Sequence, residues 1–223
     1  MANVSVEGAP AVQSRPPRPR NRRGEGSLLR EDILAAATAI LERTGSEEAV
    51  TLRGIAREVG IAAPSIAPHF SDRTAIIDAV VARELTALLD MLRQAAASES
   101  DPVKRLLALC RTYASYGQSR PGRYGVLVGR HFVDDWQAQG RVMAETGPLM
   151  TAAIKLVTEA IQACIDAGAS ASTDAFADTA VLWFSLHGLI TVPQAITSVD
   201  WPDHEWLFLT CVTRSAQLTV PGA

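Results

Sequence analysis

The chain has 223 residues, which is enough for one medium-sized hydrophobic core or two small ones. Its 48% of hydrophobic and 20% of charged residues are typical of a folded globular protein and exclude a disordered or fibrous chain. The formal net charge of −3 argues against a protein that coats nucleic acid through an overall positive field.

Hydropathy and cysteine usage indicate the compartment. No uninterrupted apolar run approaches the ~20 residues that span a bilayer, and the first residues lack the charged-then-apolar pattern of a secretory signal. The three cysteines, Cys110, Cys164 and Cys211, lie far apart in apolar helical sequence. We expect them to be buried small hydrophobes rather than a disulfide framework. The sequence therefore predicts a cytoplasmic protein without a membrane partner.

The first 26 residues differ in composition from the rest of the chain. They are rich in Pro, Gly, Arg and Ser and show no apolar periodicity. The stretch 15–20, Arg-Pro-Pro-Arg-Pro-Arg, cannot be helical because proline lacks the backbone donor and clashes with the preceding turn. No acidic residue interrupts the basic run Arg15, Arg18, Arg20, Arg22 and Arg23. Residues 1–26 are therefore predicted to form a flexible Arg-rich arm.

Apolar residues at helical spacing begin after Ser27. The face of the first predicted helix consists of Ile33, Leu34, Ala37, Ile40 and Leu41. Gly45 is expected to stop this helix, because glycine accepts the left-handed conformation of a C-cap. Thr51 is the predicted N-cap of a second, short helix that Gly60 closes.

The remaining sequence also predicts helices. A third short helix is expected from Pro64 to Phe70, and Asp72 is the predicted cap of a long helix that reaches about Ala97. Later helix breaks are predicted at Asp101-Pro102, Arg120-Pro121-Gly122, Gly147-Pro148, Gly168 to Thr173 and Asp200-Trp201-Pro202. No segment alternates apolar and polar residues as a half-buried strand does. The predicted fold class is all-α.

Residues 51–70 meet the packing requirements of a helix-turn-helix. Ala56 is small where the two helices cross, and Gly60 permits the left-handed turn between them. The second helix is short and buries little besides Ile66 and Phe70, so it projects from the body. The major groove of DNA has the width of one α-helix, and the pattern thus predicts DNA recognition. The alternative is a pair of short helices in an ordinary bundle, which would bury more side chains.

From Leu28 to about Ala79 the chain resembles the TetR family of repressors. Members have a Gly-Val/Ile-Ser/Ala turn, a Tyr-x-His/Tyr-Phe segment and then a Lys or Arg. The corresponding residues here are Gly60-Ile61-Ala62, His69-Phe70 and Arg73. Residues 183–188, Trp-Phe-Ser-Leu-His-Gly, are similar to the Trp-His-Gly signature of one subgroup of TetR ligand-binding domains.

The resemblance implies a two-domain architecture behind the arm. A three-helix DNA-binding domain, residues 27–74, would be joined by a long helix to a helical-bundle domain for ligand binding and dimerisation, residues 75–223. The helices around 177–196 and 205–218 resemble the pair through which this family dimerises. Their apolar faces would be exposed in a monomer, which is a second argument for a homodimer.

The resemblance also implies specific DNA contacts. Arg53 would read a guanine edge, while Thr51 and Arg73 would hold phosphates. Where the family usually has a Tyr that touches a phosphate, this chain has Ala67, so one contact is missing. Ser65 and His69 are then the hydrogen-bonding groups on the exposed side of the recognition helix. The predicted DNA-binding set is Arg22, Arg23, Thr51, Arg53, Ala63, Pro64, Ser65, His69 and Arg73.

Other roles stay open for several of these residues. Arg53 and Arg73 could be solvated surface charges. His69 could be a polar neighbour of Phe70, which we assign to the core because an aromatic there pins the recognition helix to the body. The arginine arm could be a solvated tail, or it could follow the minor groove or the phosphates beside the main motif. In the second case its charge would compensate for Ala67.

The later helices carry aromatic and methionine side chains in mostly apolar sequence. Small-molecule cavities are mainly apolar with a few polar groups, so these side chains are candidates for a ligand site. The predicted ligand-binding set is Tyr113, Tyr116, Phe132, Met143, Met150, Trp183 and His187. Each of them could instead be ordinary core, and His187 could be a core histidine with satisfied ring nitrogens.

An enzyme and a protein-only adaptor are the alternative classes. The chain has no Gly-rich phosphate loop, HExxH, CxxC or Gly-x-Ser-x-Gly motif. His131 with Asp134 and Asp135 is the one local cluster with ligand potential, and we expect a solvated helix end there rather than a metal site. An adaptor would need neither the arginine arm nor the Gly60 turn. The favoured prediction is a homodimeric repressor without a cofactor that releases a palindromic operator when a small molecule binds.

Overall fold

The computed structural model describes residues 26–129 and 136–219. Within these ranges the chain forms eight α-helices and one 3₁₀ turn, and strand pairing is limited to an isolated bridge between Ser170 and Leu218. The predicted all-α class is confirmed. The arginine arm, Phe132 and the cluster around His131 lie outside the described residues.

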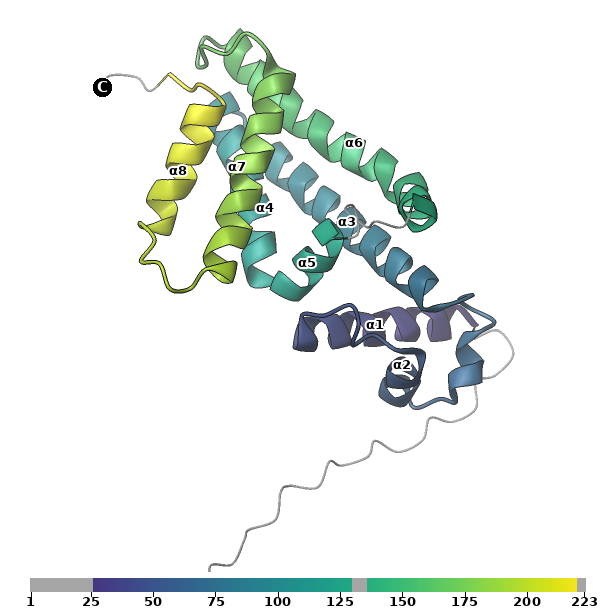
Figure 1. The fold of residues 1–223 in the computed structure, drawn as a ribbon. Helices are drawn as coiled ribbons and strands as arrows, with labels where there is room; N and C mark the ends of the chain where they lie inside the picture. Colours follow the sequence, from purple (N-terminus) through teal and green to yellow (C-terminus); the bar gives the residue numbers. More distant parts are fainter. Residues whose placement is uncertain (1–25, 130–135, 220–223) are drawn as a thin grey trace, which may run out of the picture.

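The N-terminal part consists of two helices, a turn and the start of a long helix. α1 spans Gly26–Thr44, α2 spans Leu52–Val59 and the 3₁₀ turn η1 spans Ala63–Ile66. α3 spans Arg73–Ala97 without interruption. Figure 1 shows α1 and α2 together at one end of the molecule, with α3 leading from them into the second part.

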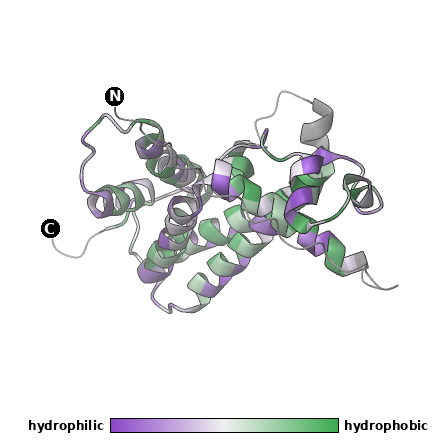
Figure 2. Ribbon diagram, turned by 90° about the horizontal axis from the view of Figure 1, so that it is seen from below, coloured by the Kyte–Doolittle hydropathy of each residue, from purple (hydrophilic) through white to green (hydrophobic). Residues whose placement is uncertain are grey.

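Five more helices surround the distal part of α3. They are α4 (Pro102–Ser119), α5 (Pro121–Gly129), α6 (Trp136–Asp166), α7 (Ala175–Ala195) and α8 (His204–Ser215). α4 and α6 pack on α3, α7 packs on α4 and α6, and α8 packs on α7. α5 contacts both α3 and α1, so it connects the bundle with the N-terminal part. Figure 2 shows that apolar residues gather where the helices face one another.

The helix ends follow the predicted capping residues. The side chains of Thr51, Asp72 and Asp101 accept hydrogen bonds from the backbone three residues on, at 3.0, 2.8 and 2.9 Å. Gly45 and Gly60 have φ of 64° and 79°, the left-handed conformation expected where α1 and α2 stop. Apart from the one at Gly147-Pro148, the predicted helix breaks are confirmed.

The break predicted at Gly147-Pro148 is wrong. α6 continues through Pro148, which lies inside the helix. Proline removes one helical hydrogen bond and usually bends a helix, and the tight packing of neighbouring helices can hold such a bend. Gly147 eases the fit because it has no Cβ to clash with the proline ring. In Figure 1 the N-terminal part of α6 points in a different direction from the rest.

The third helix is shorter than predicted. The sequence predicts a helix from Pro64 to Phe70, whereas the structure has only the 3₁₀ turn Ala63–Ile66. Pro68 explains the difference, because its ring would clash with the carbonyl four residues earlier and it has no N–H to donate. The chain instead closes with a hydrogen bond from His69 N–H to the carbonyl of Ile66 at 2.9 Å.

Buried apolar residues from α1 to α8 form one continuous cluster. Cys110 and Cys164 are buried, as predicted, while Cys211 is half-buried, and all three are free thiols. Burial raises the pKa of Cys110 to about 12, so this thiol stays neutral at physiological pH. These cysteines therefore pack as small hydrophobes.

Two stretches are long and apolar enough to cross a membrane by length and composition alone. They are Thr146–Asp166 of α6 and Ala175–Ala195 of α7 among the residues searched. The expectation from uninterrupted apolar runs missed them, because single polar residues break each run without lowering its mean hydropathy much. Core helices of soluble proteins pass the same test, so these stretches are weak evidence for a membrane span.

Candidate functional site

α2 is held to the body at both ends and along one face. At its start, Thr51 Oγ1 accepts the hydrogen bond from Gly54 N–H. At its end, Gly60 N–H donates to the carbonyl of Ala56 at 2.9 Å, and the chain turns through the left-handed region. Ile55 and Ala56 are buried, so the opposite face of α2 is presented to solvent.

The turn η1 is anchored on one side only. Ile66 and Phe70 are 2% and 6% exposed, which confirms Phe70 as a core residue. The guanidinium of Arg30 lies 4.9 Å above the Phe70 ring and covers its outer face. Pro64 and Ser65 are exposed on the other side of the turn. η1 therefore projects a short, rigid edge from the N-terminal part.

The described members of the predicted DNA-binding set come from three neighbouring elements. They are the N-cap and first turn of α2, η1 with the residues after it, and the first residue of α3. Thr51, Arg53, Pro64 and Ser65 are exposed, and Ala63, His69 and Arg73 are half-buried. Arg22 and Arg23 lie outside the described residues, so their contacts stay a prediction.

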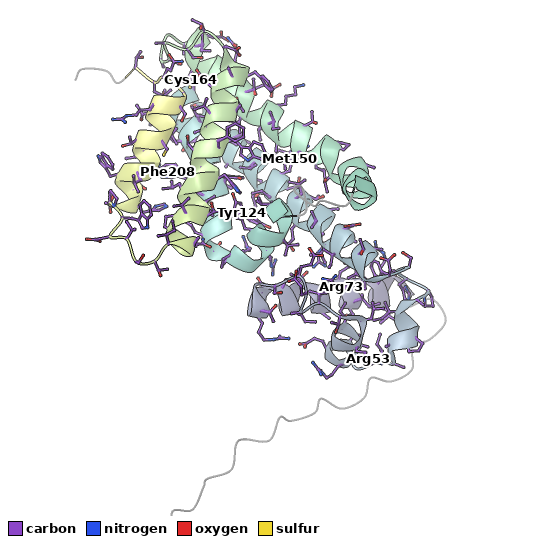
Figure 3. The ribbon with its side chains drawn as sticks, in the orientation of Figure 1. Arg53, Arg73, Tyr124, Met150, Cys164 and Phe208 are labelled. Carbon is purple, nitrogen blue, oxygen red and sulfur yellow. The ribbon has the colours of Figure 1, made fainter. Side chains whose placement is uncertain are left out.

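Arg53 points away from the body at the outer end of the molecule (Figure 3). Its guanidinium has no hydrogen bond or ion pair with any residue of the described ranges. Arg57 lies one helical turn further along α2 and is also exposed. Its spacing of four residues from Arg53 was the signal that could have identified it in the sequence. The two arginines together form a cationic edge on α2.

Arg73 is engaged within the protein. Its Nε donates to the carbonyl of Val50 at 2.6 Å, and its Nη2 donates to the carbonyl of Glu47 at 2.5 Å. The same Nη2 lies 3.5 Å from the Glu47 carboxylate. Arg73 thus ties the loop before α2 to the start of α3, and it positions Thr51 and Arg53. This contact differs from the free phosphate ligand that the resemblance implies.

A cavity of about 480 Å³ lies inside the helical bundle. Its walls come from α3, α4, α5, α6 and α7 and are mostly aliphatic. The lining residues are Leu85, Leu88, Leu92, Leu109, Cys110, Tyr113, Leu127, Val128, Met150, Ala153, Ile154, Val157, Thr179, Leu182, Trp183, Phe184 and Leu186. Among the described residues, no charged side chain belongs to this lining. Volume and composition are those of a small-molecule site.

Three of the predicted ligand residues line this cavity, namely Tyr113, Met150 and Trp183. Tyr116 and His187 do not belong to the lining. The side chain of Met143 and all of Phe132 lie outside what the structure describes. The aliphatic lining of α3 and α6 was not singled out in the sequence, because its residues follow the same periodicity as the rest of the core.

Tyr113 is part of a hydrogen-bonded chain at one wall of the cavity. Trp183 Nε1 donates to Tyr113 Oη at 3.1 Å, and Tyr113 Oη lies 2.9 Å from Tyr124 Oη. Tyr124 Oη lies 2.6 Å from His187 Nδ1. Burial lowers the pKa of His187 and raises the pKa of both tyrosines, so the neutral form of each group is favoured.

Tyr116 belongs to a second polar cluster between the bundle and α1. Its hydroxyl donates to the buried carboxylate of Glu84 at 3.0 Å, and Arg123 Nη1 lies 3.2 Å from the same carboxylate. Arg123 Nε lies 2.7 Å from a carboxylate oxygen of Glu42 on α1 and forms an ion pair with it. Burial beside Glu84 raises the pKa of Tyr116.

The N-terminus of α5 packs closely against the C-terminus of α1. A Cβ placed on Gly122 would lie 2.5 Å from the carbonyl oxygen of Leu41, so only glycine fits this contact. Leu127 and Val128 of the same helix line the cavity. α5 is therefore a short, direct mechanical link between the cavity wall and the N-terminal part, alongside the covalent link through α3.

The outer face of α7 and α8 carries large exposed apolar side chains. Those on the two helices and their connection are Phe176, Val181, Phe184, Val192, Ile196, Val199, Trp201, Trp206 and Leu209. Phe176, Phe184 and Trp206 are 65%, 67% and 56% exposed. Large apolar side chains that gather on two packed helices of a folded protein favour an interaction surface. We call it the α7–α8 face.

The described part of the chain offers no grouping of metal ligands. There, no three His, Cys, Asp or Glu side chains come together in a way that could hold a metal ion. The cluster of His131, Asp134 and Asp135 falls in the undescribed segment, so the expectation for it stays untested.

Known proteins resemble the chain in both parts. Residues 33–80 match the model for bacterial regulatory proteins of the tetR family, and residues 106–203 match the model for a tetracyclin repressor-like C-terminal domain. The nucleoid occlusion factor SlmA of Escherichia coli strain K12 / DH10B and that of Klebsiella pneumoniae strain 342 are each 24% identical over 114 residues. The match covers 51% of this chain and 58% of those relatives.

Solved structures share the fold over most of the chain. A protein of unknown function from Rhodococcus sp. RHA1 has a TM-score of 0.73 at 24% identity and covers 88% of this chain and 97% of its own. The TetR family regulator PfmR of Thermus thermophilus has a TM-score of 0.63 at 15% identity, with coverages of 84% and 99%.

The FadR regulator of Bacillus subtilis, solved with stearoyl-CoA, has a TM-score of 0.68 at 10% identity, with coverages of 83% and 97%. At these identities the structures show the fold, while the two family matches identify both domains. The chain belongs to the TetR family of transcriptional regulators, non-enzymatic DNA-binding proteins with a ligand-binding C-terminal domain.

Proposed function

We propose that this chain is a homodimeric repressor in the cytoplasm that binds a palindromic operator and releases it when an apolar small molecule fills the cavity. The proposal rests on the packing of α5, which connects the cavity with the DNA-binding part. Leu127 and Val128 of α5 line the cavity, and Gly122 of the same helix touches Leu41 of α1. A ligand that displaces the cavity wall therefore acts on the helix that supports α2.

The surface around α2 and η1 supports operator binding. Arg53 and Arg57 project from α2 without partners among the described residues, and arginine at the start of such a helix suits a guanine edge. Ser65 and Pro64 form the edge beside them. Thr51, Ala63 and His69 complete the proposed surface, with Arg22 and Arg23 as arm contacts. Arg73 acts by holding the loop before α2.

The α7–α8 face supports the homodimer. Its large apolar side chains are open to water in one chain, and a two-fold contact of this face with itself would bury them. Phe184 belongs both to this face and to the cavity lining. A partner subunit seated here would therefore also cover one side of the cavity. Two-fold symmetry of the protein requires a matching symmetry of the operator half-sites.

A gel-shift assay with the DNA upstream of the protein's own gene tests the proposal. We expect one retarded complex that contains two chains per operator and resists excess unrelated DNA. Footprinting should show two related half-sites one or more helical turns apart. The double variant Arg53→Ala/Arg57→Ala is the matched control, because it removes the cationic edge and leaves the buried face of α2 intact.

Three results would contradict the proposal. A folded dimer that binds unrelated DNA as tightly as every upstream fragment would not be a sequence-specific regulator. Protection of one asymmetric half-site by a single chain would exclude the two-fold complex. An operator complex that is unchanged when a cavity ligand is saturating would exclude release by that ligand.

A further inference from the structure

The polar atoms in the cavity wall decide which ligand it recognises. Among the lining side chains, those with an O–H or N–H donor are Tyr113, Thr179 and Trp183. Cys110 adds a thiol, which is a weak donor and stays neutral. The other described side chains of the lining are apolar. The hydrogen-bonding character of the cavity therefore depends on where three protons point.

Two of these protons are used within the protein. Trp183 Nε1–H, which can only donate, is directed to Tyr113 Oη at 3.1 Å. Thr179 Oγ1–H donates to the carbonyl of Ala175 at 2.7 Å, one turn earlier in α7. Neither residue has a second polar hydrogen on its side chain. Neither can therefore donate to a molecule in the cavity without breaking a bond already formed.

The third proton, on Tyr113, is directed by the far end of the chain. Tyr124 Oη and His187 Nδ1 lie 2.6 Å apart. A phenol is the stronger acid and a neutral imidazole nitrogen the stronger base, so we assign His187 the tautomer with its proton on Nε2, in which Tyr124 donates to Nδ1. Tyr124 then has no proton left for Tyr113, and the 2.9 Å contact between the two hydroxyls requires Tyr113 to donate.

Tyr113 Oη is consequently an acceptor toward the cavity. A hydroxyl oxygen has two lone pairs, and Trp183 occupies one of them. Its own proton points to Tyr124, away from the cavity. Thr179 Oγ1 is the other hydroxyl oxygen of the lining, and it already lies 3.0 Å from Thr158 Oγ1. Among the described residues, the wall thus offers a lone pair of Tyr113 and no uncommitted strong donor. The described lining residues also include no cation, so among them an anion would be buried without a charged partner.

We propose that the cavity selects a neutral apolar molecule with one hydrogen-bond donor, a phenol or an alcohol, whose O–H donates to Tyr113 Oη. This inference rests on the proposed function, in that the cavity is the ligand site of the regulator. A carboxylate or a phosphate ester is rejected by the same wall, because it brings acceptors and a charge where the protein has only an acceptor.

Three matched probes test the inference on the full-length protein at neutral pH by isothermal titration calorimetry. para-Heptylphenol has the apolar body and the donor, para-heptylanisole replaces the donor hydrogen by a methyl group, and para-heptylbenzoate carries an anion. We expect the phenol to bind about fivefold to tenfold more tightly than the anisole, as one buried neutral hydrogen bond provides. The benzoate should bind most weakly of the three.

Two tyrosine variants locate the hydrogen bond. Tyr113→Phe removes the acceptor in the cavity wall and should abolish the preference for the phenol over the anisole. Tyr116→Phe removes a buried hydroxyl that bonds to Glu84 outside the cavity, and the preference should persist. Thermal unfolding of both variants checks that each is folded, so a lost preference in Tyr113→Phe reports the missing oxygen.

Several outcomes would overturn the inference. Equal binding of phenol and anisole, tighter binding of the benzoate, or a preference that survives in Tyr113→Phe would each exclude recognition through Tyr113. Absence of binding by all three probes would exclude the cavity as a site for this ligand class. A gel shift on the same preparation separates these outcomes from failure of the proposed function, because operator binding needs no ligand.

Discussion

Arg53 and Arg73 show how differently two arginines of one surface are used. Arg53 extends from α2 without a partner among the described residues, whereas Arg73 donates hydrogen bonds to the carbonyls of Val50 and Glu47. A free guanidinium can reach a base edge, while a bonded one holds a loop in place. We therefore expect Arg53 to recognise the DNA sequence and Arg73 to hold the loop before α2 in position.

The first prediction is that Arg53→Ala lowers operator affinity by about 1–3 kcal/mol and relaxes preference at one base pair per half-site. The loss of a bidentate contact to guanine is the physical reason. Arg93→Ala is the control, because Arg93 is exposed near the far end of α3, away from α2. Binding to a set of single-base operator variants measures the effect. An equal loss on all of them would make Arg53 a phosphate contact.

The second prediction concerns His187. Burial lowers its pKa below the ordinary 6.5, so the folded state binds this proton less readily than the unfolded state. The contribution of neutral His187 to the free energy of unfolding is fully present above pH 6.5. It decreases as the pH falls below that value. We expect a decrease in Tm on acidification that is smaller in His187→Asn, whose side-chain oxygen accepts a hydrogen bond without titrating.

Thermal unfolding between neutral and mildly acidic pH measures this effect. The comparison variants are His69→Asn and His204→Asn, at the other two histidines in the described ranges. A wild-type curve and a His187→Asn curve with identical pH dependence would show that the protonation of His187 is not linked to folding.

Local rules predicted the residues whose role depends on their neighbours in sequence. Thr51 caps α2, Gly60 turns the chain, and Phe70 is buried, all as the spacing indicates. The partners of Arg73 and Tyr124 were not predictable in this way. Tyr124 meets His187 across 63 positions, and such contacts exist only after α4, α5 and α7 have packed. The hydrogen-bonded wall of the cavity is a property of the tertiary structure.

At the scale of elements, most boundaries could be predicted from caps and helix-breaking residues. The two errors, the break predicted at Gly147-Pro148 and the helix predicted from Pro64 to Phe70, both concern a proline whose effect on the helix the sequence pattern did not predict. Pro148 lies inside the long helix α6, which continues on both sides of it, whereas Pro68 follows the single turn η1. The helix around a proline, rather than the proline alone, decides whether the helix ends there or only loses one hydrogen bond.

The third prediction tests the contact between α5 and α1. Gly122→Ala would place a methyl group 2.5 Å from the carbonyl oxygen of Leu41, a backbone atom that cannot rotate away. We expect a destabilisation of about 1–3 kcal/mol in urea unfolding, as overpacking usually costs.

Gly125→Ala is the matched control on the same helix. Its Cβ would meet nothing within 4 Å, so helix propensity alone predicts a gain of about 0.8–1 kcal/mol. Equal stability of the two variants would contradict the close contact between Gly122 of α5 and Leu41 of α1.

At the scale of the whole molecule, the proposed homodimer depends on the α7–α8 face. The fourth prediction is that Trp206→Glu converts the dimer to a monomer in analytical ultracentrifugation, because it places a charge at a side chain that is 56% exposed in one chain and buried in the proposed dimer. Leu28→Glu, at an equally exposed apolar residue of α1, should leave the dimer intact. A dimeric Trp206→Glu protein would place the interface elsewhere.

The last prediction is that ligand and operator weaken each other by the same factor. If an apolar ligand favours a conformation in which α5 shifts against α1, the spacing of the two recognition elements changes and the operator is bound less well. Coupling free energies of this kind are about 1–3 kcal/mol, or roughly 5-fold to 150-fold in affinity. Linkage requires that saturating operator raise the Kd of para-heptylphenol by that factor, which two calorimetric titrations measure.

The ion pair between Arg123 of α5 and Glu42 of α1 lies on the proposed path. Glu42→Gln keeps the shape of this contact and removes its charge, so we expect each single affinity to change little and the coupling factor to fall. Glu159→Gln breaks a more exposed ion pair with Lys155 on α6, away from α1, and should leave the coupling unchanged. If Glu42→Gln and the wild type had the same coupling factor, this ion pair would not carry the signal, which would then pass through the Gly122–Leu41 contact or through α3.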